Sequence, residues 1–169
     1  MPATGVRPTG QRVRTVLFDT LAGGRFGTVL PGAVVLDAFA GSGALGLEAL
    51  SRGAASASFI ENAPAALAAL RRNIDHLGRA ADCRVFARSA LAPGPAPLAH
   101  GLALLDPPYG QGLAEAALPA LAGWLAADAL VVVEVAAREG FVPPPGLSLL
   151  EERVVGAARL IFCAASGSR

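Results

Sequence analysis

The densest group of chemically useful residues is a glycine turn, Gly41-Ser42-Gly43-Ala44-Leu45-Gly46, which fits the pattern G-x-G-x-x-G. An apolar run precedes it, a helical pattern follows it, and Glu61 comes 20 residues after Gly41. In α/β folds such glycines let the backbone approach a ligand at a helix N-terminus, and a carboxylate after the second strand accepts hydrogen bonds from ribose hydroxyls. The pattern therefore predicts a site for an adenosine-containing cofactor. A tight turn followed by a solvated glutamate is the alternative.

Asp37 indicates which cofactor to expect. It lies four residues before Gly41, near the end of the apolar run 33–38. A carboxylate there would repel the pyrophosphate of a dinucleotide, but it could hold the ammonium group of S-adenosylmethionine directly or through water. We therefore expect S-adenosylmethionine rather than NAD. The alternative is that Asp37 accepts hydrogen bonds from the amides of the glycine turn itself.

A second motif, Asp106-Pro107-Pro108-Tyr109, follows the apolar run 102–105. An aromatic amine is a weak nucleophile because its lone pair is conjugated into the ring, and acceptors on its two N–H groups would aim that lone pair at a methyl group. The Asp106 carboxylate and the Pro107 carbonyl could be these acceptors, held by stiff prolines. The Tyr109 ring could stack on an unpaired base. The motif predicts methylation of an exocyclic amine by positioning, without a covalent nucleophile; a rigid turn with a half-buried tyrosine is the alternative.

The apolar pattern predicts the elements that would hold these motifs. Helical and extended segments alternate, which is typical of an α/β fold with a largely parallel sheet. We expect a single domain, 1–169, with an N-terminal helical segment, 1–25, and a core, 33–164. Asn62 is expected to cap the third helix. The expected strands are 33–38, 57–60, 83–87, 102–105 and 130–135, and a hairpin around Gly156 follows them. The first expected helix starts at Thr9 or Gly10 and ends at Gly23-Gly24. The other expected helices are 44–51, 64–78 and 113–125.

Composition narrows the class of protein. Hydrophobic residues make up 53% and charged residues 16% of the chain, which indicates a compact globular protein. No apolar run approaches the ~20 residues that cross a bilayer, no signal sequence is recognisable, and Cys83 and Cys163 lack metal-ligand spacing. We expect a cytoplasmic protein without a metal. Because the net charge is only +1, RNA contacts would depend on a local cluster that contains Arg7, Arg12 and Arg14.

The remaining candidate side chains receive no functional role. His76, at a helix end, and His100, in a loop, are expected at the surface. Trp124 closes an apolar helix face and Cys163 lies in an apolar strand, so both are expected in the core.

Taken together, these residues resemble the bacterial RsmD family, whose members methylate N2 of a guanine in 16S ribosomal RNA. The resemblance is carried by the segment from Val35 to Ala54, which includes the glycine turn, and by Asp106-Pro107-Pro108-Tyr109 downstream. Arg7-Pro8-Thr9 and Arg12-Val13-Arg14 carry it upstream, and it extends from Arg7 to about Phe162.

The resemblance implies a Rossmann-like class I methyltransferase, with a seven-stranded, mostly parallel sheet, helices on both faces and an antiparallel C-terminal hairpin. It also implies ribosomal RNA as the partner. Because few arginines lie near the presumed base site, we expect this RNA to be recognised within an assembled or assembling small subunit, and we expect a monomeric enzyme. The implied cofactor-binding residues are Asp37, Phe39, Gly41, Gly43, Glu61, Ser89, Ala90 and Asp106; the catalytic residues are Asp106, Pro107, Pro108 and Tyr109; the RNA-binding residues are Arg7, Thr9, Arg12 and Arg14.

The sequence departs from the family pattern in three places. Family members usually carry a basic segment ahead of the position of Arg7, Ser89 stands where Asp or Asn is common, and Val155-Gly156 replaces a frequent aromatic-Gly pair. The first departure lowers the affinity for naked RNA that we expect. Two other functions stay open: N-methylation of DNA adenine, DNA cytosine or a protein amide, whose enzymes more often carry Asn in place of Asp106, and a non-catalytic module that binds S-adenosylmethionine or RNA.

Overall fold

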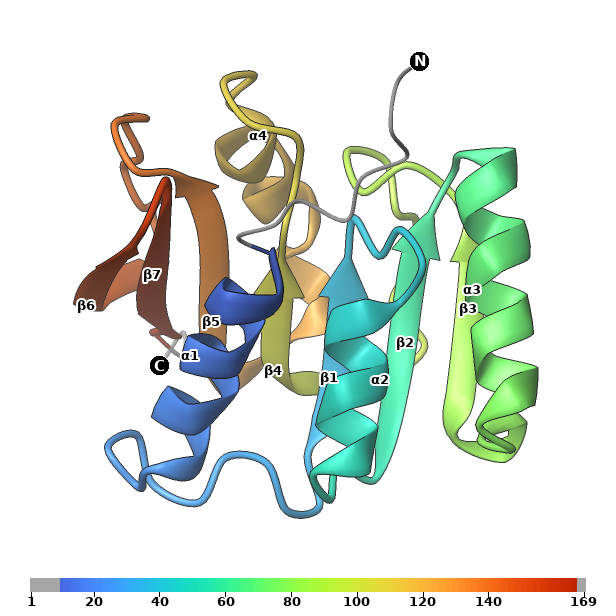
Figure 1. The fold of residues 1–169 in the computed structure, drawn as a ribbon. Helices are drawn as coiled ribbons and strands as arrows, with labels where there is room; N and C mark the ends of the chain where they lie inside the picture. Colours follow the sequence, from blue (N-terminus) through green and yellow to red (C-terminus); the bar gives the residue numbers. More distant parts are fainter. Residues whose placement is uncertain (1–9, 167–169) are drawn as a thin grey trace.

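The computed structural model describes residues 10–166, which form one seven-stranded sheet with helices on both faces (Figure 1). The strand order is β3-β2-β1-β4-β5-β7-β6; the first five strands of this order run parallel, and β7 pairs antiparallel with both β5 and β6. The predicted α/β class and C-terminal hairpin are confirmed. The strands are β1 (Val34–Ala38), β2 (Ser56–Glu61), β3 (Cys83–Ala87), β4 (His100–Leu105), β5 (Leu125–Ala136), β6 (Leu147–Val155) and β7 (Ala158–Ala165), and the helices are α1 (Gly10–Ala22), α2 (Ala44–Ser51), α3 (Pro64–His76) and α4 (Leu113–Ala120), with 3-10 turns η1 (Ala80–Asp82) and η2 (Ala122–Trp124).

The two faces of the sheet carry separate apolar cores. On the face turned toward the viewer in Figure 1, α1, α2 and α3 bury residues such as Leu17, Leu50 and Leu70 against the strands. On the opposite face, α4 and η2 bury Leu118 and Trp124. Since both faces of the central strands are covered, these strands are mostly apolar, as is usual for parallel sheets.

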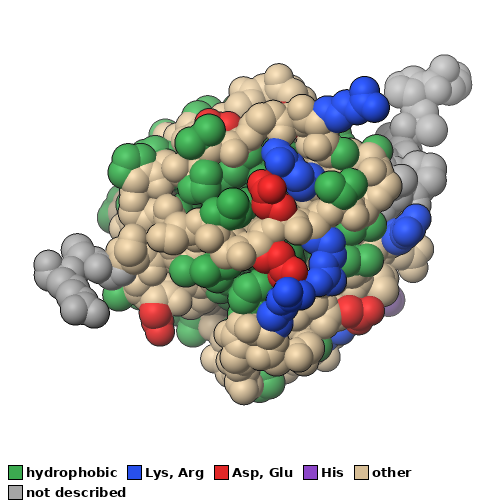
Figure 2. All heavy atoms as spheres, turned by 90° about the vertical axis from the view of Figure 1, so that its left-hand side faces the viewer, with side chains coloured by type: hydrophobic (Ala, Val, Ile, Leu, Met, Phe, Trp, Pro, Cys, Tyr) green, Lys and Arg blue, Asp and Glu red, His purple; other side chains and the backbone are tan. Residues whose placement is uncertain are grey.

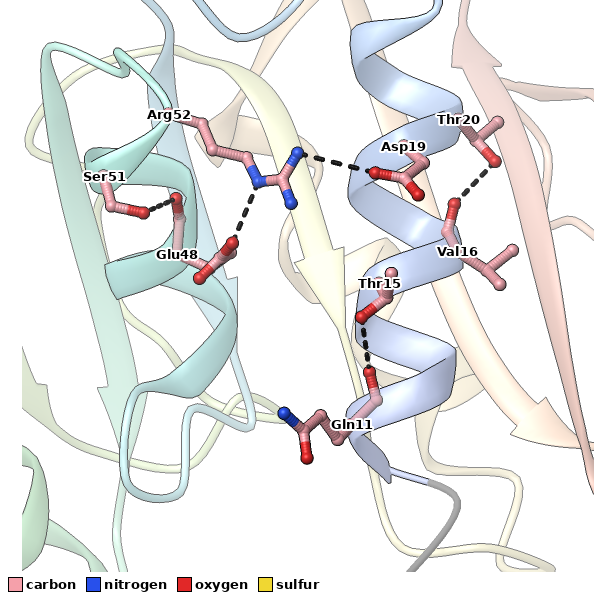
Figure 3. A network of polar contacts seen from close by, with 8 residues as sticks. All are labelled: Gln11, Thr15, Val16, Asp19, Thr20, Glu48, Ser51 and Arg52. Atoms are coloured by element: carbon pink, nitrogen blue, oxygen red, sulfur yellow. Dashed lines mark hydrogen bonds and ion pairs between the residues drawn. The ribbon is translucent and has the colours of Figure 1, made fainter.

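Arg52 links α2 to α1 (Figure 3). Its Nε donates a hydrogen bond to Glu48 Oε1 at 2.9 Å, its Nη1 lies 3.8 Å from Asp19 Oδ1, and its guanidinium lies over the Phe18 ring. Partly exposed pairs of this kind contribute little stability. They connect α2 to the C-terminal half of α1, and the other end of α1 lies at the edge of the sheet where β1, β2 and β4 end (Figure 1).

The β6 edge of the sheet carries acidic and basic side chains interleaved with apolar ones (Figure 2). Arg25 and Arg153 both pair with Glu151, and Arg159 pairs with Glu152. In the part of the chain that the structure describes, this edge is therefore electrically mixed and offers no uniform basic patch. Among the helices of residues 10–166, none is long and apolar enough to cross a membrane.

The predicted helix 113–125 is wrong at its C-terminal end. α4 stops at Ala120, η2 follows, and β5 begins at Leu125 instead of the predicted residue 130. Pro119 lies in the last turn of α4. Because proline crowds the preceding turn and lacks an N–H for the helical hydrogen bonds, it favours an early end of the helix.

His100 is not the surface residue that the sequence predicts, because it begins β4 and is fully buried. Its Nδ1 lies 2.8 Å from the Trp124 carbonyl oxygen and its Nε2 lies 2.9 Å from Ser58 Oγ. A carbonyl only accepts, so Nδ1 carries the proton and Nε2 accepts the hydroxyl of Ser58. Burial lowers the pKa of His100, because the charged form would lose its water. The predicted core positions of Trp124 and Cys163 are confirmed.

The lowered pKa of His100 makes the stability of the fold sensitive to acid. A histidine that is held neutral in the folded state contributes stability fully above the unfolded pKa, near 6.5, and loses that contribution as the pH falls toward its lowered folded pKa. The contribution of His100 to the free energy of unfolding should therefore fall below pH 6.5, with a slope of at most about 1.4 kcal/mol per pH unit. His100→Gln should flatten this part of the profile in urea unfolding.

The matched control is His76→Gln, since the chain has two histidines and His76 is exposed. An acid limb that is equally steep in wild type and His100→Gln would contradict the assignment.

Candidate active site

Three carboxylates meet at the edge where the parallel strands end. Asp37 lies in β1 opposite Leu104 of β4, Glu61 ends β2, and Asp106 follows the last residue of β4. Since Ala38 is paired with both Ile60 and Leu105, the three strand ends lie side by side. Asp106 and Glu61 both act electrostatically on Asp37. The topology thus brings together the carboxylates of both sequence motifs.

The glycines of the turn have different physical roles. Gly41 has a φ of 56°, and a Cβ there would meet nothing within 4 Å, so its backbone is open to a ligand. A Cβ on Gly43, whose φ is 87°, would lie 2.4 Å from Leu70 Cδ1. A Cβ on Gly46 would lie 2.4 Å from the Phe59 ring. Gly41 therefore allows an approach from outside, whereas Gly43 and Gly46 let α2 pack closely against α3 and the sheet.

Phe39 joins β1 to the glycine turn in a strained conformation. Its φ of 62° makes it the one non-glycine residue with positive φ in the described part of the chain. Such a conformation costs on the order of 1–3 kcal/mol and is concentrated at functional sites. The half-buried Phe39 side chain packs against the core that contains Ile60 and Ala90, so the strain turns the chain sharply at the strand end while the ring stays anchored.

Glu61 fastens the glycine turn to the start of α3. Its Oε1 accepts the Gly41 N–H at 2.9 Å, and its Oε2 accepts the N–H groups of Asn62 and Ala63 at 2.9 and 2.8 Å. The prediction that Asn62 caps α3 is wrong: the N-cap is Ala63 without a side-chain hydrogen bond, and the Glu61 carboxylate binds these amides instead. A carboxylate has about four acceptor positions, so one remains for a ribose hydroxyl, and a second ribose bond requires the exchange of a backbone one.

Asp37 is almost completely buried, and its Oδ2 accepts the Gly46 N–H at 2.9 Å. The alternative that the sequence left open, a bond to an amide of the glycine turn, is therefore present for this oxygen. Burial raises the pKa of Asp37 well above its usual value; the bond from Gly46 opposes this shift, and the nearby charges of Asp106 and Glu61 add to it. A cation beside Asp37 would offset both the free-energy cost of burying its charge and the repulsion from the other two carboxylates.

The loop from residue 106 to 112, which joins β4 to α4, is called here the base-site loop. Asp106 Oδ1 is buried and accepts no hydrogen bond from the described residues. Pro107 is buried, Pro108 is exposed, and the half-buried Tyr109 donates its hydroxyl to Glu134 Oε1 at 3.2 Å. A buried acceptor without a donor is costly, and such an atom fits an amine N–H brought by a ligand.

Ser89 and Ala90 follow β3, whose last residue is paired with Glu61. Ser89 Oγ accepts the Leu91 N–H at 3.1 Å, so it stabilises its own turn, and Ala90 is buried in the core beneath Phe39. Both residues lie at the edge that carries the three carboxylates. Their predicted adenine contact stays a prediction.

Two of the four predicted RNA-binding residues lie in the described part of the chain. Arg7 and Thr9 fall outside the described residues. Arg12, exposed, and Arg14, half-buried, lie in the first turns of α1, which begins at the same edge of the sheet (Figure 1). Glu134, which contacts Tyr109, was not among the predicted site residues. A glutamate inside the apolar run of β5 was a signal that could have pointed to it.

Comparison with known proteins shows the family. A family model described as Conserved hypothetical protein 95 matches residues 1–164. The chain belongs to this family, the RsmD family. Ribosomal RNA small subunit methyltransferase D of Escherichia coli (strain K12) is 44% identical over 158 residues, which cover 90% of this chain and 76% of that protein. The protein of the same name from Haemophilus influenzae is 35% identical and is covered to 79%. The resemblance stated from the sequence is thus confirmed.

Solved structures agree with the RsmD assignment. The methyltransferase yhhF of Escherichia coli superposes with a TM-score of 0.83 at 38% identity, over 99% of this chain and 92% of that one. The magnesium protoporphyrin IX methyltransferase of Synechocystis, solved with bound S-adenosylmethionine, gives a TM-score of 0.71 at 15% identity, over 94% of this chain and 80% of that one. The second likeness concerns the fold alone. The predicted Rossmann-like methyltransferase fold is confirmed.

The burial of Asp37 predicts a variant that is more stable than the wild type. Asp37→Asn removes a buried charge and its repulsion by Asp106 and Glu61, while an amide oxygen can still accept the Gly46 N–H. The free energy of unfolding should rise by ~1 kcal/mol or more, which corresponds to about 2–4 °C in Tm for a chain of this size. The gain should be larger at pH 8 than at pH 5, because a raised folded pKa lets the wild-type carboxyl regain its proton, and its stability, as the pH falls.

Calorimetric melting across this pH range tests the expectation, and the exposed Asp128 gives the matched control Asp128→Asn. A lower Tm for Asp37→Asn than for the wild type at pH 8 would show that the charge is compensated in the folded protein.

Proposed function

We propose that this chain transfers a methyl group from S-adenosylmethionine to the exocyclic N2 amine of a guanine in small-subunit ribosomal RNA. The coarser part of this statement follows from the RsmD family: relatives that are up to 44% identical carry the name ribosomal RNA small subunit methyltransferase D. The chain is a methyltransferase of ribosomal RNA, and S-adenosylmethionine is its methyl donor. The observation that carries the choice of an amine is the buried Oδ1 of Asp106, to which no residue of the described range 10–166 donates a hydrogen bond.

The residues at the strand ends fit a cationic cofactor. Asp37, Glu61 and Asp106 give this edge a negative charge, which favours the sulfonium and ammonium groups of S-adenosylmethionine and disfavours the pyrophosphate of a dinucleotide. The open backbone at Gly41 and the remaining acceptor position of Glu61 suit the ribose end. When bound, the cofactor supplies a methyl group already activated on a positively charged sulfur.

The base-site loop supplies alignment. Asp106 Oδ1 accepts one N–H of the target amine and the Pro107 carbonyl accepts the other, which draws the nitrogen lone pair out of conjugation and toward the methyl group. The Tyr109 ring stacks on the base, as unpaired bases require. As the new N–C bond forms, the methyl–sulfur bond breaks and its electron pair stays on sulfur, while the nitrogen becomes positively charged. Asp106 would stabilise that charge and accept the departing proton. No nucleophile of the protein takes part.

The choice of substrate follows from the small number of arginines near the site. In the described part of the chain, Arg12 and Arg14 are the arginines at the start of α1, and the β6 edge is electrically mixed. A protein with few phosphate contacts binds naked RNA weakly. A guanine held unstacked within an assembled or assembling small subunit is therefore the favoured target. We propose that the enzyme acts on it in the cytoplasm as a monomer. Methylation of DNA or of a protein amide is the second candidate, since the same acceptors would serve it.

Asp106→Asn tests the role of the unpartnered oxygen. The amide group can turn a donor toward the target amine, so single-turnover methylation should slow by about 10²-fold or more, while the affinity for S-adenosylmethionine and for the ribosomal particle changes far less. Rapid-quench measurement of methyl transfer, with calorimetry for binding, separates the two effects. Asp128→Asn makes the same chemical change at an exposed site and should react at the wild-type rate. Wild-type kinetics in Asp106→Asn would refute the proposed base site.

Arg12→Ala tests the substrate. The exposed Arg12 should contribute to binding of the particle, so the variant should lower kcat/KM on undermethylated small subunits about 3- to 10-fold, as expected for one phosphate contact, with unchanged cofactor affinity. The wild type should methylate these particles well and protein-free RNA poorly. Equal activity on naked RNA, or activity on duplex DNA alone, would contradict the proposal.

A further inference from the structure

Two glutamates from outside the base-site loop hold it at adjacent residues. Glu134 of β5 accepts the Tyr109 hydroxyl at 3.2 Å, and Glu139, which follows β5, accepts the Gly110 N–H through its Oε1. Neither glutamate belongs to the glycine turn or to the Asp106-Pro107-Pro108-Tyr109 motif. Both contacts fall on the part of the loop that carries the tyrosine ring, and this arrangement calls for a physical explanation.

Glu134 occupies an unusual place for a carboxylate. It stands between Val133, which is fully buried, and Val135, which is 3% exposed, in a strand that is apolar around it. Since Leu105 of β4 is paired with Val133, the next residues along the two parallel strands are Asp106 and Glu134. A carboxylate at such a position costs free energy unless it is hydrogen-bonded. The hydrogen bond from the Tyr109 hydroxyl offsets this cost, and it places Glu134 against the base-site loop.

Glu139 is itself held by the neighbouring strand. Arg159 of β7 donates to the Glu139 carbonyl oxygen through Nη2 and pairs with Glu152 of β6 through Nη1 at 3.2 Å. The Glu139 carboxylate then reaches the Gly110 N–H, where the chain turns with a φ of 76°. The turn after Tyr109 is therefore tied through two side chains to the antiparallel end of the sheet.

We propose that Glu134 and Glu139 are positioning residues of the base-site loop, Glu134 orienting the Tyr109 ring through its hydroxyl and Glu139 fixing the backbone turn at Gly110. A tyrosine ring has two side-chain torsions, and a hydrogen bond at its far end restricts both. A ring held in place presents one stacking surface to the target base, and small misplacements of a reacting group are costly in rate. This inference rests on the proposed function of Tyr109 as the stacking platform.

The kinetic test is a double-mutant cycle. Glu134→Leu removes the acceptor and Tyr109→Phe removes the donor with the ring retained; each should lower kcat on undermethylated small subunits by about 10-fold, with an unchanged affinity for S-adenosylmethionine. The double variant should be no slower than either single variant, because both break the same bond. Glu134→Gln keeps an acceptor and should restore most of the rate, as should Glu139→Gln relative to Glu139→Ala.

A second readout does not depend on activity. The chain contains one tyrosine, so isotope-labelled tyrosine gives a single set of ring signals in an NMR spectrum. Glu134→Leu should shift the Tyr109 ring signals, whereas Asp128→Asn, at the exposed opposite end of the same strand, should leave them in place. This readout still applies if the substrate assigned under the proposed function is wrong.

The outcomes separate cleanly. A shifted Tyr109 signal with non-additive kinetic losses supports the proposal. Losses that add in the double variant would mean that Glu134 acts independently of the hydroxyl, and an unchanged ring signal in Glu134→Leu would mean that the bond does not hold the ring; either result overturns it. If Glu134→Leu fails to fold, Glu134→Met, which is close to glutamate in length and lacks an oxygen acceptor, takes its place in the cycle with Tyr109→Phe.

Discussion

The burial of Asp37 beside two other carboxylates, at one end of a parallel sheet, is the constraint to which the surrounding structure responds. Burial raises the pKa of Asp37 well above its usual value, and the nearby charges of Asp106 and Glu61 add to this shift to a smaller extent. Backbone amides supply the compensation that the protein itself provides. Gly46 donates to Asp37, and three amides from the glycine turn and the start of α3 donate to Glu61. Asp106 Oδ1 receives no such donor from the described residues, so the protein leaves one acid for its ligands.

This distribution of donors explains the packing around the site. The amide of Gly46 reaches Asp37 because α2 lies very close to the sheet. That closeness is possible because Gly46 has no Cβ, which would collide with the Phe59 ring of β2. The strained Phe39 turns the chain between Asp37 and the glycine turn. Electrostatics, glycine placement and backbone strain therefore serve one purpose: they hold negative charge at an edge where a cationic methyl donor and an amine can meet.

Local patterns predicted the parts of this structure that depend on neighbours in the sequence. The glycine turn, the strand bounds of β3, the bounds of α2 and the core positions of Trp124 and Cys163 agree with the structure, because each follows from spacing and burial of adjacent residues. The errors arose where distant segments decide the outcome. His100 is buried because Ser58 and the Trp124 carbonyl, 42 and 24 residues away, satisfy its ring. Asn62 does not cap α3; its own amide and that of Ala63, just before the helix, donate to Glu61 instead. The position of Glu134 beside Asp106 became visible only from the pairing of β5 with β4.

The central claim is that the unpartnered Asp106 oxygen is built for the exocyclic amine of a guanine. The most direct measurement is mass spectrometry of the nucleosides released from small subunits that lack the modification, after incubation with this protein and S-adenosylmethionine labelled in its methyl group. The account predicts the label in N2-methylguanosine. Label in a methylated adenosine or cytidine, in ribosomal protein, or in no product would contradict it.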